Sequence, residues 1–290
     1  NGDTKRPLLY LTIAGILNVI LNLFFVIVCK MAADGVALAS VISQYVSAIL
    51  VVWHMMRLND ACKFYFQRLR FHGDEVGRIL GLGVPAGIQH MIFAIANLFI
   101  QAAVNSFDST MVSGNAAAAN TDTIIYNIMM AFYTACSTFM GQNWGAGHKK
   151  RMMDSYLISL FYAFAVAAVL GVAFYFAGRP FLYVFTNSAD VVEAGMQRMK
   201  IMCFSYAISA FMDNTIAACR GLGRTIVPTV VVIMGSCVFR VIWVYTIFAH
   251  YHTIPSLYLL YAFSWTITAA AEIVYFLHCF RKLRLVPETA

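Results

Sequence analysis

Charged residues are scarce in this chain. Of its 290 residues, 11% are Asp, Glu, Lys or Arg and 61% are hydrophobic. An average soluble domain carries about 25% charged residues and about half apolar residues. The low charge and the high apolar content exclude an ordinary soluble domain and indicate an integral membrane protein.

Motifs that mark catalytic or metal centres are also missing. The seven cysteines form no C-x-x-C pair, and the seven histidines show no metal-ligand spacing. The sequence contains no nucleophile elbow, no glycine-rich phosphate loop and no H-E-x-x-H motif. We therefore expect neither an enzyme nor a resident metal or organic cofactor.

Long apolar runs are present instead. A hydrocarbon core of about 30 Å requires about 20 helical residues at ~1.5 Å each, and runs of this length favour helices over the ~10-residue strands of a barrel. The sequence predicts an all-α integral membrane protein, a polytopic helix bundle. The predicted spans are 7–28, 36–56, 79–104, 116–140, 155–178, 197–219, 226–249 and 257–280.

The distribution of basic residues predicts the orientation in the membrane. If the N-terminus is cytoplasmic, fifteen Lys and Arg residues lie in cytoplasmic segments, and Arg240 alone lies within a span. Since cytoplasmic loops are rich in Lys and Arg, we expect a multi-pass protein of the cell membrane with both termini in the cytoplasm. Scattered charge without a recognition fold argues against nucleic-acid binding. The basic residues assigned to the outer side are Lys30, Arg179, Arg198 and Lys200.

One short phrase occurs twice. Gly-x-Thr-x-x-Pro stands at residues 2–7 and again at residues 223–228, an offset of 221. The same offset overlays the first two spans on the last two. Internal repeats of this kind are typical of transporters that are built from two related halves. Four spans separate the two overlaid pairs, so we expect four further helices, or roughly 150 residues, before the first residue of this chain.

The repeat defines a domain plan with twelve helices in two six-helix lobes, and we expect the full-length protein to be a monomer. The linker between the lobes is rich in charged and aromatic residues, which suits a helix lying at the membrane surface. The expected parts are residues 1–56 as the last two helices of the N-terminal lobe, 57–78 as a cytoplasmic inter-lobe linker, 79–284 as the C-terminal six-helix lobe, and 285–290 as a cytoplasmic tail.

Several segments resemble a known family. GQNWGAG at 141–147 resembles the GQxxGAG signature of the multidrug and toxic compound extrusion (MATE) family, and GVPAGIQ at 83–89 resembles the start of its seventh helix. Residues 219–223 resemble its LRGxG segment, with Cys in place of the usual Leu. The resemblance implies a secondary transporter of twelve helices that exports drugs or organic cations in exchange for sodium ions or protons. The matching residues are Gly141, Gln142, Gly145, Gly147, Arg220, Gly221 and Gly223.

One departure from the family pattern concerns the coupling ion. Many members carry a glutamate eight residues after the proline of the seventh helix, and that position is Phe93 here. Coupling must therefore use another acid or the N-terminal lobe, which leaves sodium and proton both open. The GQNWGAG turn also has two readings, a capped helix end or part of a gate, because its glycines permit a tight turn and Gln142 can satisfy freed backbone groups.

Polar side chains within the spans predict a cavity. Amides recur at four-residue spacing in the span 79–104, so they share one helix face, and the following span is also rich in polar residues. Neutral amides in hydrocarbon face protein or a water-filled space. Each amide alone suits helix packing, but two adjacent polar faces favour a hydrated substrate cavity. The candidates for lining it are Gln89, Asn97, Gln101, Tyr126, Asn127 and Asn214.

Charged residues within the spans are candidates for ion or proton coupling, because each costs ~2.5–3.5 kcal/mol on insertion scales. They are Asp213, Asp122, Arg240 and Glu272. Asp213 also fits an ordinary acid near the cytoplasmic helix end. Helix rise places Asp122 within about 5 Å of the depth of Arg240, so we expect an Asp122–Arg240 pair. The pair would lock the lobe and open on protonation or substrate binding, although a purely structural clamp explains the same geometry.

Two alternatives to an antiporter remain. A lipid-linked oligosaccharide flippase of related architecture needs a larger and more basic cavity, whereas Arg240 alone is basic within the predicted spans. A membrane-embedded enzyme or receptor needs a convergent catalytic set or a large extramembrane domain, and the sequence shows neither. We therefore expect a cation-coupled antiporter that exports drugs or organic cations by alternating access between the two lobes.

Overall fold

The computed structural model describes residues 5–58 and 63–283. Gly2 and Thr4 of the first repeat phrase, and the tail 285–290, lie outside these residues. The described residues form helices and no β-strand, and eight helical spans are long and apolar enough to cross a membrane. The predicted all-α membrane architecture with eight spans is confirmed.

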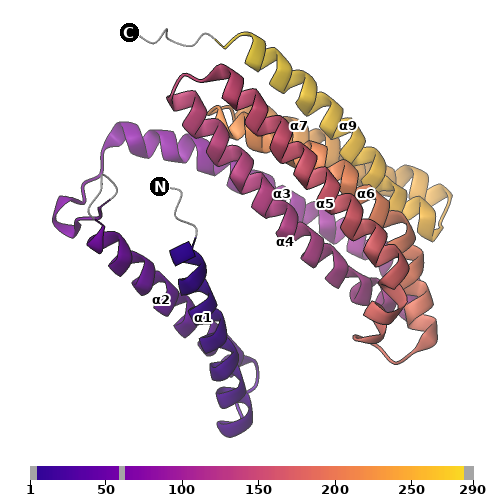
Figure 1. Cartoon of the computed structure of the whole chain (residues 1–290). Coiled ribbons are helices and arrows are strands. Elements are labelled where there is room, and N and C mark those ends of the chain that lie inside the picture. Colours follow the sequence, from indigo (N-terminus) through magenta and orange to yellow (C-terminus); the bar gives the residue numbers. More distant parts are fainter. Residues whose placement is uncertain (1–4, 59–62, 284–290) are drawn as a thin grey trace. The chain divides into compact units, whose positions relative to one another are not determined.

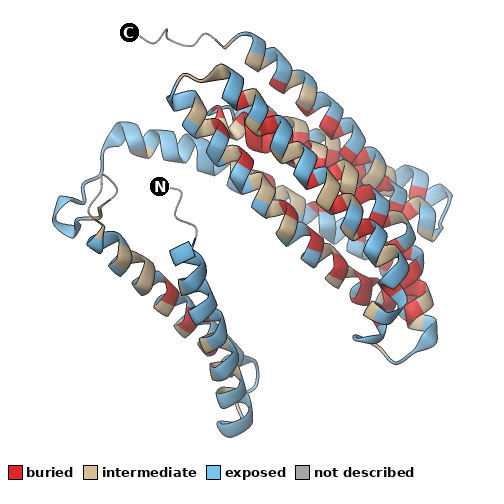
Figure 2. Cartoon of the chain, viewed as in Figure 1, coloured by how far each residue is buried: buried red, intermediate tan, exposed pale blue. Residues whose placement is uncertain are grey.

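The chain divides into two compact units, Asn1–His72 and Gly73–Ala290 (Figure 1). The first unit holds two spans that pack against each other through one face of the second span. The buried positions on that face recur every four residues and are all small, namely Gly35, Ala39, Ser43 and Ser47. The remaining faces are largely exposed (Figure 2). The helices of this unit are α1 (Lys5–Leu23), the π-helix η1 (Phe24–Val28) and α2 (Ala33–Arg57).

The segment after α2 differs from the sequence expectation of a surface helix. The described residues between α2 and the second unit contain only the short 3-10 helix η2 (Phe66–Arg68). The next helix, α3, begins at Gly73, within the range 57–78 that the sequence assigns to the linker. Acidic residues in its first turn, Asp74 and Glu75, suit the positive end of the helix dipole and explain this early start.

The second unit contains six spans, and one of them is segmented. In that span, two π-helical segments flank the short helix that carries Arg240. The elements are α3 (Gly73–Val104), α4 (Ser109–Gly145), α5 (Lys149–Tyr183), α6 (Ala189–Gly221), α7 (Ile226–Val232), η3 (Ile233–Val238), α8 (Phe239–Trp243), η4 (Val244–Phe248) and α9 (Ile254–Arg281).

Capping side chains set two of the helix starts. The carboxylate of Asp108 accepts a hydrogen bond from the backbone of Met111 at 3.0 Å and starts α4. Thr253 and Ser256 form a reciprocal capping box at the start of α9. These caps begin both helices before their apolar runs, so the helices are longer than the predicted spans.

Helix α6 is the central element of the second unit. It packs against α4, α5 and α9 and carries buried residues along its whole length (Figure 2). Small residues of α5, including Ala163, Ala167 and Gly171, are buried. A Cβ atom at Gly171 would overlap the backbone carbonyl of Cys203 on α6. The two backbones therefore approach closely, as small residues permit in membrane bundles.

The two family-like segments pack against each other where α4 and α6 end. A Cβ atom at Gly221 would lie 2.6 Å from Cβ of Met140, and one at Gly141 would lie 3.4 Å from the carbonyl oxygen of Gly221. Gly147 and Gly223 follow the two helices with φ of +76° and +71°, a backbone conformation that favours glycine. The packing of α4 on α6 thus explains Gly141 and Gly221, and the positive φ explains Gly147 and Gly223.

Candidate functional site

A cavity of about 610 Å³ lies inside the second unit, between α3, α4, α6, α8 and α9. Ligand pockets typically measure about 300–1,000 Å³ and combine apolar walls with a few polar groups. Seven of the ten coupling and cavity candidates expected from the sequence line this one cavity, although they come from four different helices. Those residues are Gln89, Asn97, Gln101, Asp122, Tyr126, Asp213 and Arg240.

Three expected site residues lie elsewhere. Asn214 is fully buried and accepts a hydrogen bond from Ser159 at 2.9 Å, which joins α6 to α5. Asn127 is exposed and is not part of the cavity lining. Glu272 on α9 is fully buried away from the lining, and neither carboxylate oxygen has a hydrogen-bond partner among the described residues.

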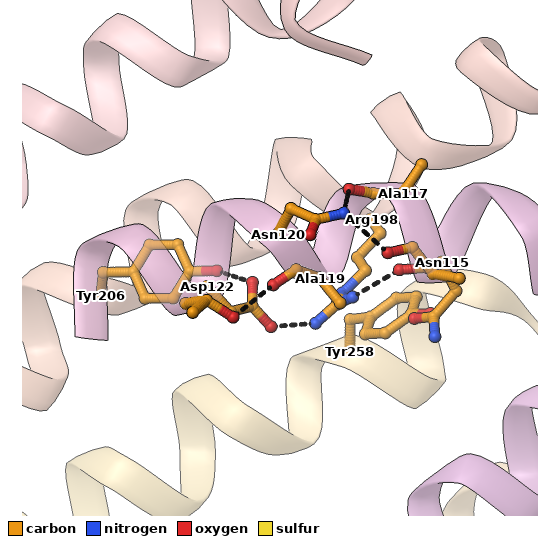
Figure 3. Close-up of polar contacts among 10 residues, drawn as sticks. Asn115, Ala117, Ala119, Asn120, Asp122, Arg198, Tyr206 and Tyr258 are labelled. Atoms are coloured by element: carbon orange, nitrogen blue, oxygen red, sulfur yellow. Dashed lines mark hydrogen bonds and ion pairs between the residues drawn. The ribbon is translucent and has the colours of Figure 1, made fainter. Parts of the chain in front are cut away.

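Asp122 forms its ion pair with Arg198 (Figure 3). Its second carboxylate oxygen accepts a hydrogen bond from the hydroxyl of Tyr206. Arg198 also donates to the backbone carbonyl of Asn115 at 2.9 Å, and Tyr258 donates to the side-chain oxygen of Asn115 at 2.6 Å. This network connects α4, α6 and α9.

The expected Asp122–Arg240 pair is therefore wrong. Arg198 was assigned to the outer side because a span that starts at residue 197 puts it at the membrane edge. The helix starts eight residues earlier, at Ala189, and buries Arg198 to 5% exposure. The signal for the earlier start was Ser188 followed by Asp190, since a serine before an acidic first turn is typical of a helix start.

Arg240 has a different environment. Its Nε donates to the hydroxyl of Ser264 at 3.1 Å, and the side chain is 2% exposed. One terminal nitrogen of the guanidinium has no hydrogen-bond partner among the described residues. Three aromatic rings surround the guanidinium carbon, with centroids 5.5 Å away for Phe93, 4.5 Å for Tyr261 and 5.7 Å for Trp265.

Arg220, a residue of the family-like motif at the end of α6, also lines the cavity. It donates to the hydroxyl of Tyr133 at 2.6 Å and to Oε1 of Gln89 at 2.8 Å. Thr229 donates to the same oxygen of Gln89 at 3.3 Å. The side chains that Arg220 holds are therefore neutral, and they join α6 to α3 and α4.

Asp213 lies on α6, seven residues before Arg220, and lines the same cavity. Its carboxylate makes no hydrogen bond or ion pair within the described part of the chain, and Arg240 and Arg220 are the charged groups that act on it electrostatically. The charged lining residues are thus three arginines and two aspartates, of which Arg198 and Asp122 neutralise each other. The expectation of a single basic residue in the spans is corrected, because Arg198 and Arg220 both lie within α6.

Comparison with known proteins identifies the family. Residues 85–246, more than half of the chain, match the family model described as MatE. The chain is 30% identical over 205 residues to the probable multidrug resistance protein YpnP of Bacillus subtilis, covering 71% of this chain and 46% of that protein. It is 25% identical over 201 residues to the FAD transporter of Shewanella oneidensis, covering 66% of this chain and 43% of that protein. The chain thus spans about half the length of these relatives.

Solved structures agree with this assignment. A MOP superfamily transporter from Pyrococcus furiosus has a TM-score of 0.88 at 17% identity, covering 97% of this chain and 63% of that chain. A MATE crystal structure in the straight conformation has a TM-score of 0.88 at 16% identity, with the same coverage. The eight described spans of this chain therefore match part of the fold of MATE transporters, which have twelve helices in two lobes. Together with the sequence match, this shows that the chain belongs to the MatE family of membrane transporters, which are not enzymes.

Proposed function

We propose that the protein is a cation-coupled antiporter that exports drugs or related amphipathic molecules from the cell. The observation that carries the proposal is the 610 Å³ cavity of the second unit, which is lined by Asp213, an acid whose carboxylate has no hydrogen bond or ion pair among the described residues. Membership of the MatE family and the likeness to a multidrug resistance protein support a drug transporter. Alternating access would expose the cavity to the two sides of the membrane in turn.

Asp213 is the residue that we assign to coupling. An acid in a membrane helix is costly unless it is paired or used in function, and Asp213 has neither an ion pair nor a hydrogen bond in the described residues. A sodium ion or a proton would neutralise it on one side of the membrane and leave on the other. Asp122 has a structural role in this proposal, because Arg198 and Tyr206 already satisfy both of its oxygens.

The flippase alternative is less well supported. The cavity is more basic than the sequence indicated, but the family match and the multidrug relatives favour small substrates. Among the relatives, an FAD transporter stands beside the multidrug resistance proteins, so family membership alone leaves the charge of the substrate open.

Transport by the full-length protein in proteoliposomes tests the proposal. We expect accumulation of a fluorescent drug panel to depend on an imposed sodium or proton gradient, and the gradient that supports it identifies the coupling ion. Asp213→Asn should reduce gradient-driven accumulation at least tenfold and leave substrate binding in detergent within about threefold. Asp190→Asn is the matched control, because Asp190 is an exposed acid in the first turn of the same helix.

Two results would reject the proposal. One is accumulation that is indifferent to both gradients across the panel. The other is an Asp213→Asn protein whose gradient dependence matches that of Asp190→Asn, which would move coupling to another acid such as Glu272 or to the N-terminal lobe.

A further inference from the structure

The guanidinium of Arg240 is a binding group that the protein leaves partly unused. It is 2% exposed, it lines the cavity, and one of its terminal nitrogens has no partner among the described residues. The hydrogen bond from Nε to Ser264 fixes the orientation of the guanidinium. A buried donor without a partner is costly, so a ligand atom that accepts from it would bind favourably.

The aromatic residues around Arg240 restrict what that ligand can be. Phe93, Tyr261 and Trp265 all lie within cation–π distance of its guanidinium carbon. A cationic substrate would have to compete with the guanidinium of Arg240 for the faces of these rings. The terminal nitrogen without a partner is buried, so a ligand would reach the N–H edge of the guanidinium from the cavity that Arg240 lines. The planar fork of a guanidinium matches carboxylate, sulfonate and phosphate groups.

The charge balance of the lining leads to the same conclusion. Asp122 neutralises Arg198, and Arg220 is held by two neutral side chains. Asp213 is then the one lining carboxylate left to balance Arg220 and Arg240, and His90 adds no negative charge. Glu272, buried outside the lining, also interacts electrostatically with Arg220, but no carboxylate other than Asp213 acts on Arg240 among the described residues. When the coupling ion neutralises Asp213, the lining has a net positive charge. A like-charged substrate is disfavoured in such a cavity.

We propose that the transported molecule is an amphipathic anion whose carboxylate, sulfonate or phosphate group binds the guanidinium of Arg240 while its apolar body packs on the aromatic and methionine side chains of the cavity. This inference rests on the proposed transport function and names its substrate class. Phe93 is consistent with it: a glutamate at that position, as the family resemblance implies for many members, would place a competing carboxylate beside Arg240.

A matched set of ligands tests the inference with the full-length protein in detergent. The probes share one ring system and differ in charge: 1-naphthoate, 1-naphthamide and 1-naphthylmethylammonium. We expect calorimetry to show at least tenfold tighter binding of 1-naphthoate than of the other two. Arg240→Gln and, independently, Phe93→Glu should each remove that preference. Arg179→Gln should preserve it, because Arg179 is an exposed arginine paired with Glu193 outside the cavity.

The outcomes separate this inference from the proposed function. Equal or tighter binding of the ammonium probe, compared with 1-naphthoate, overturns the inference. An unchanged preference of Phe93→Glu for 1-naphthoate overturns it as well. Phe93→Glu removes no buried charge, so it still tests the inference if Arg240→Gln fails to fold. Gradient-driven transport of cations alone would leave the exporter intact and reject the anion. Anion preference in binding without gradient-driven transport of any probe would reject the exporter instead.

Discussion

The two members of the Asp122–Arg198 ion pair differ in their access to water. The Arg198 side chain is 7% exposed, whereas that of Asp122 is 33% exposed and borders the cavity. Removing the carboxylate of Asp122 leaves the buried Arg198 without a counter-ion. Removing the guanidinium of Arg198 leaves the carboxylate of Asp122, which water can reach. The two single substitutions should therefore differ in their effect.

We expect Asp122→Asn to lower the free energy of unfolding by about 3–5 kcal/mol, the usual loss on breaking a buried pair. Arg198→Gln should cost about 1–3 kcal/mol, in the range of a polar group left without its partner. Thermal unfolding of the full-length protein in detergent measures both. The double variant should lose less than the sum of the single variants, and fully additive losses would contradict the pairing.

For Glu272, in contrast to the ion pair, we expect a substitution to change the stability little. It is fully buried, and its oxygens have no hydrogen-bond partner in the described part of the chain. Glu272→Gln therefore removes no hydrogen bond, and it removes both the cost of burying a carboxylate and the attraction of Arg220 for it. Since these two effects oppose each other, we expect a change in unfolding free energy within about 1 kcal/mol together with unchanged substrate binding. A large loss of stability in the same thermal assay would show that the carboxylate has a partner outside the described residues, such as a bound ion.

At the scale of helices, the close contact between α5 and α6 depends on a glycine, Gly171, because this residue has no Cβ atom. A Cβ atom at Gly171 would overlap the carbonyl oxygen of Cys203, which is backbone and cannot rotate away. Gly171→Ala should separate the helices and destabilise the second unit by about 1–3 kcal/mol. Gly77→Ala is the control, because nothing lies within 4 Å of a Cβ atom there, and alanine is the better helix former. Equal melting temperatures for the two variants would contradict the close approach.

The sequence predicted the helices better than their relative rotation. Apolar runs located all eight spans, because length and hydropathy are properties of each helix alone. The start of α6 was placed too late, since charged residues in its first turns resemble a loop. The Asp122–Arg240 pair was inferred from depth, and depth does not determine which way a side chain points. The π-helical segment η3, which precedes α8, has i→i+5 bonds, so the face on which Arg240 lies does not follow from the spacing of a regular helix.

In the candidate site, too, the sequence predicted which residues share a helix face but not which helices meet there. Regular spacing identified Gln89, Asn97 and Gln101 as one polar face, and all three line the cavity. Tyr258, Tyr261 and Trp265 on α9 also line it, but aromatic residues are so common in membrane helices that nothing in the sequence marked them. Their role follows from the packing of α9 against α6, which is a property of the bundle.

For the whole molecule, the ends of the second unit predict the topology. Ser106 and His252, from different connections, are hydrogen-bonded at 2.8 Å and so lie at one end of the bundle. Lys149 donates to the backbone of Leu283 at 3.2 Å at the turn after α4 and the end of α9. These contacts fit alternating spans, and the basic residues predict that the Lys149 end faces the cytoplasm.

Cysteine labelling in intact cells measures this orientation. In a background without the seven natural cysteines, an impermeant maleimide should label Ser188→Cys and His252→Cys from outside. Lys149→Cys should react only after the membrane is opened. Labelling in the reverse pattern would invert the topology, and equal labelling of all three positions would contradict the alternation of the spans.

The burial of α6 has a consequence for how the protein is made. Its most apolar stretch has a mean hydropathy of 1.2, against 2.4 for α5 and 2.5 for the first span, and it carries Arg198, Asp213 and Arg220. A segment of this kind is a poor substrate for the translocon, since each charge opposes its partition into lipid. α5 and α6 are joined by only a few residues, so we infer that they enter the bilayer together as a hairpin. The charged residues that line the cavity thus make the membrane insertion of α6 dependent on α5.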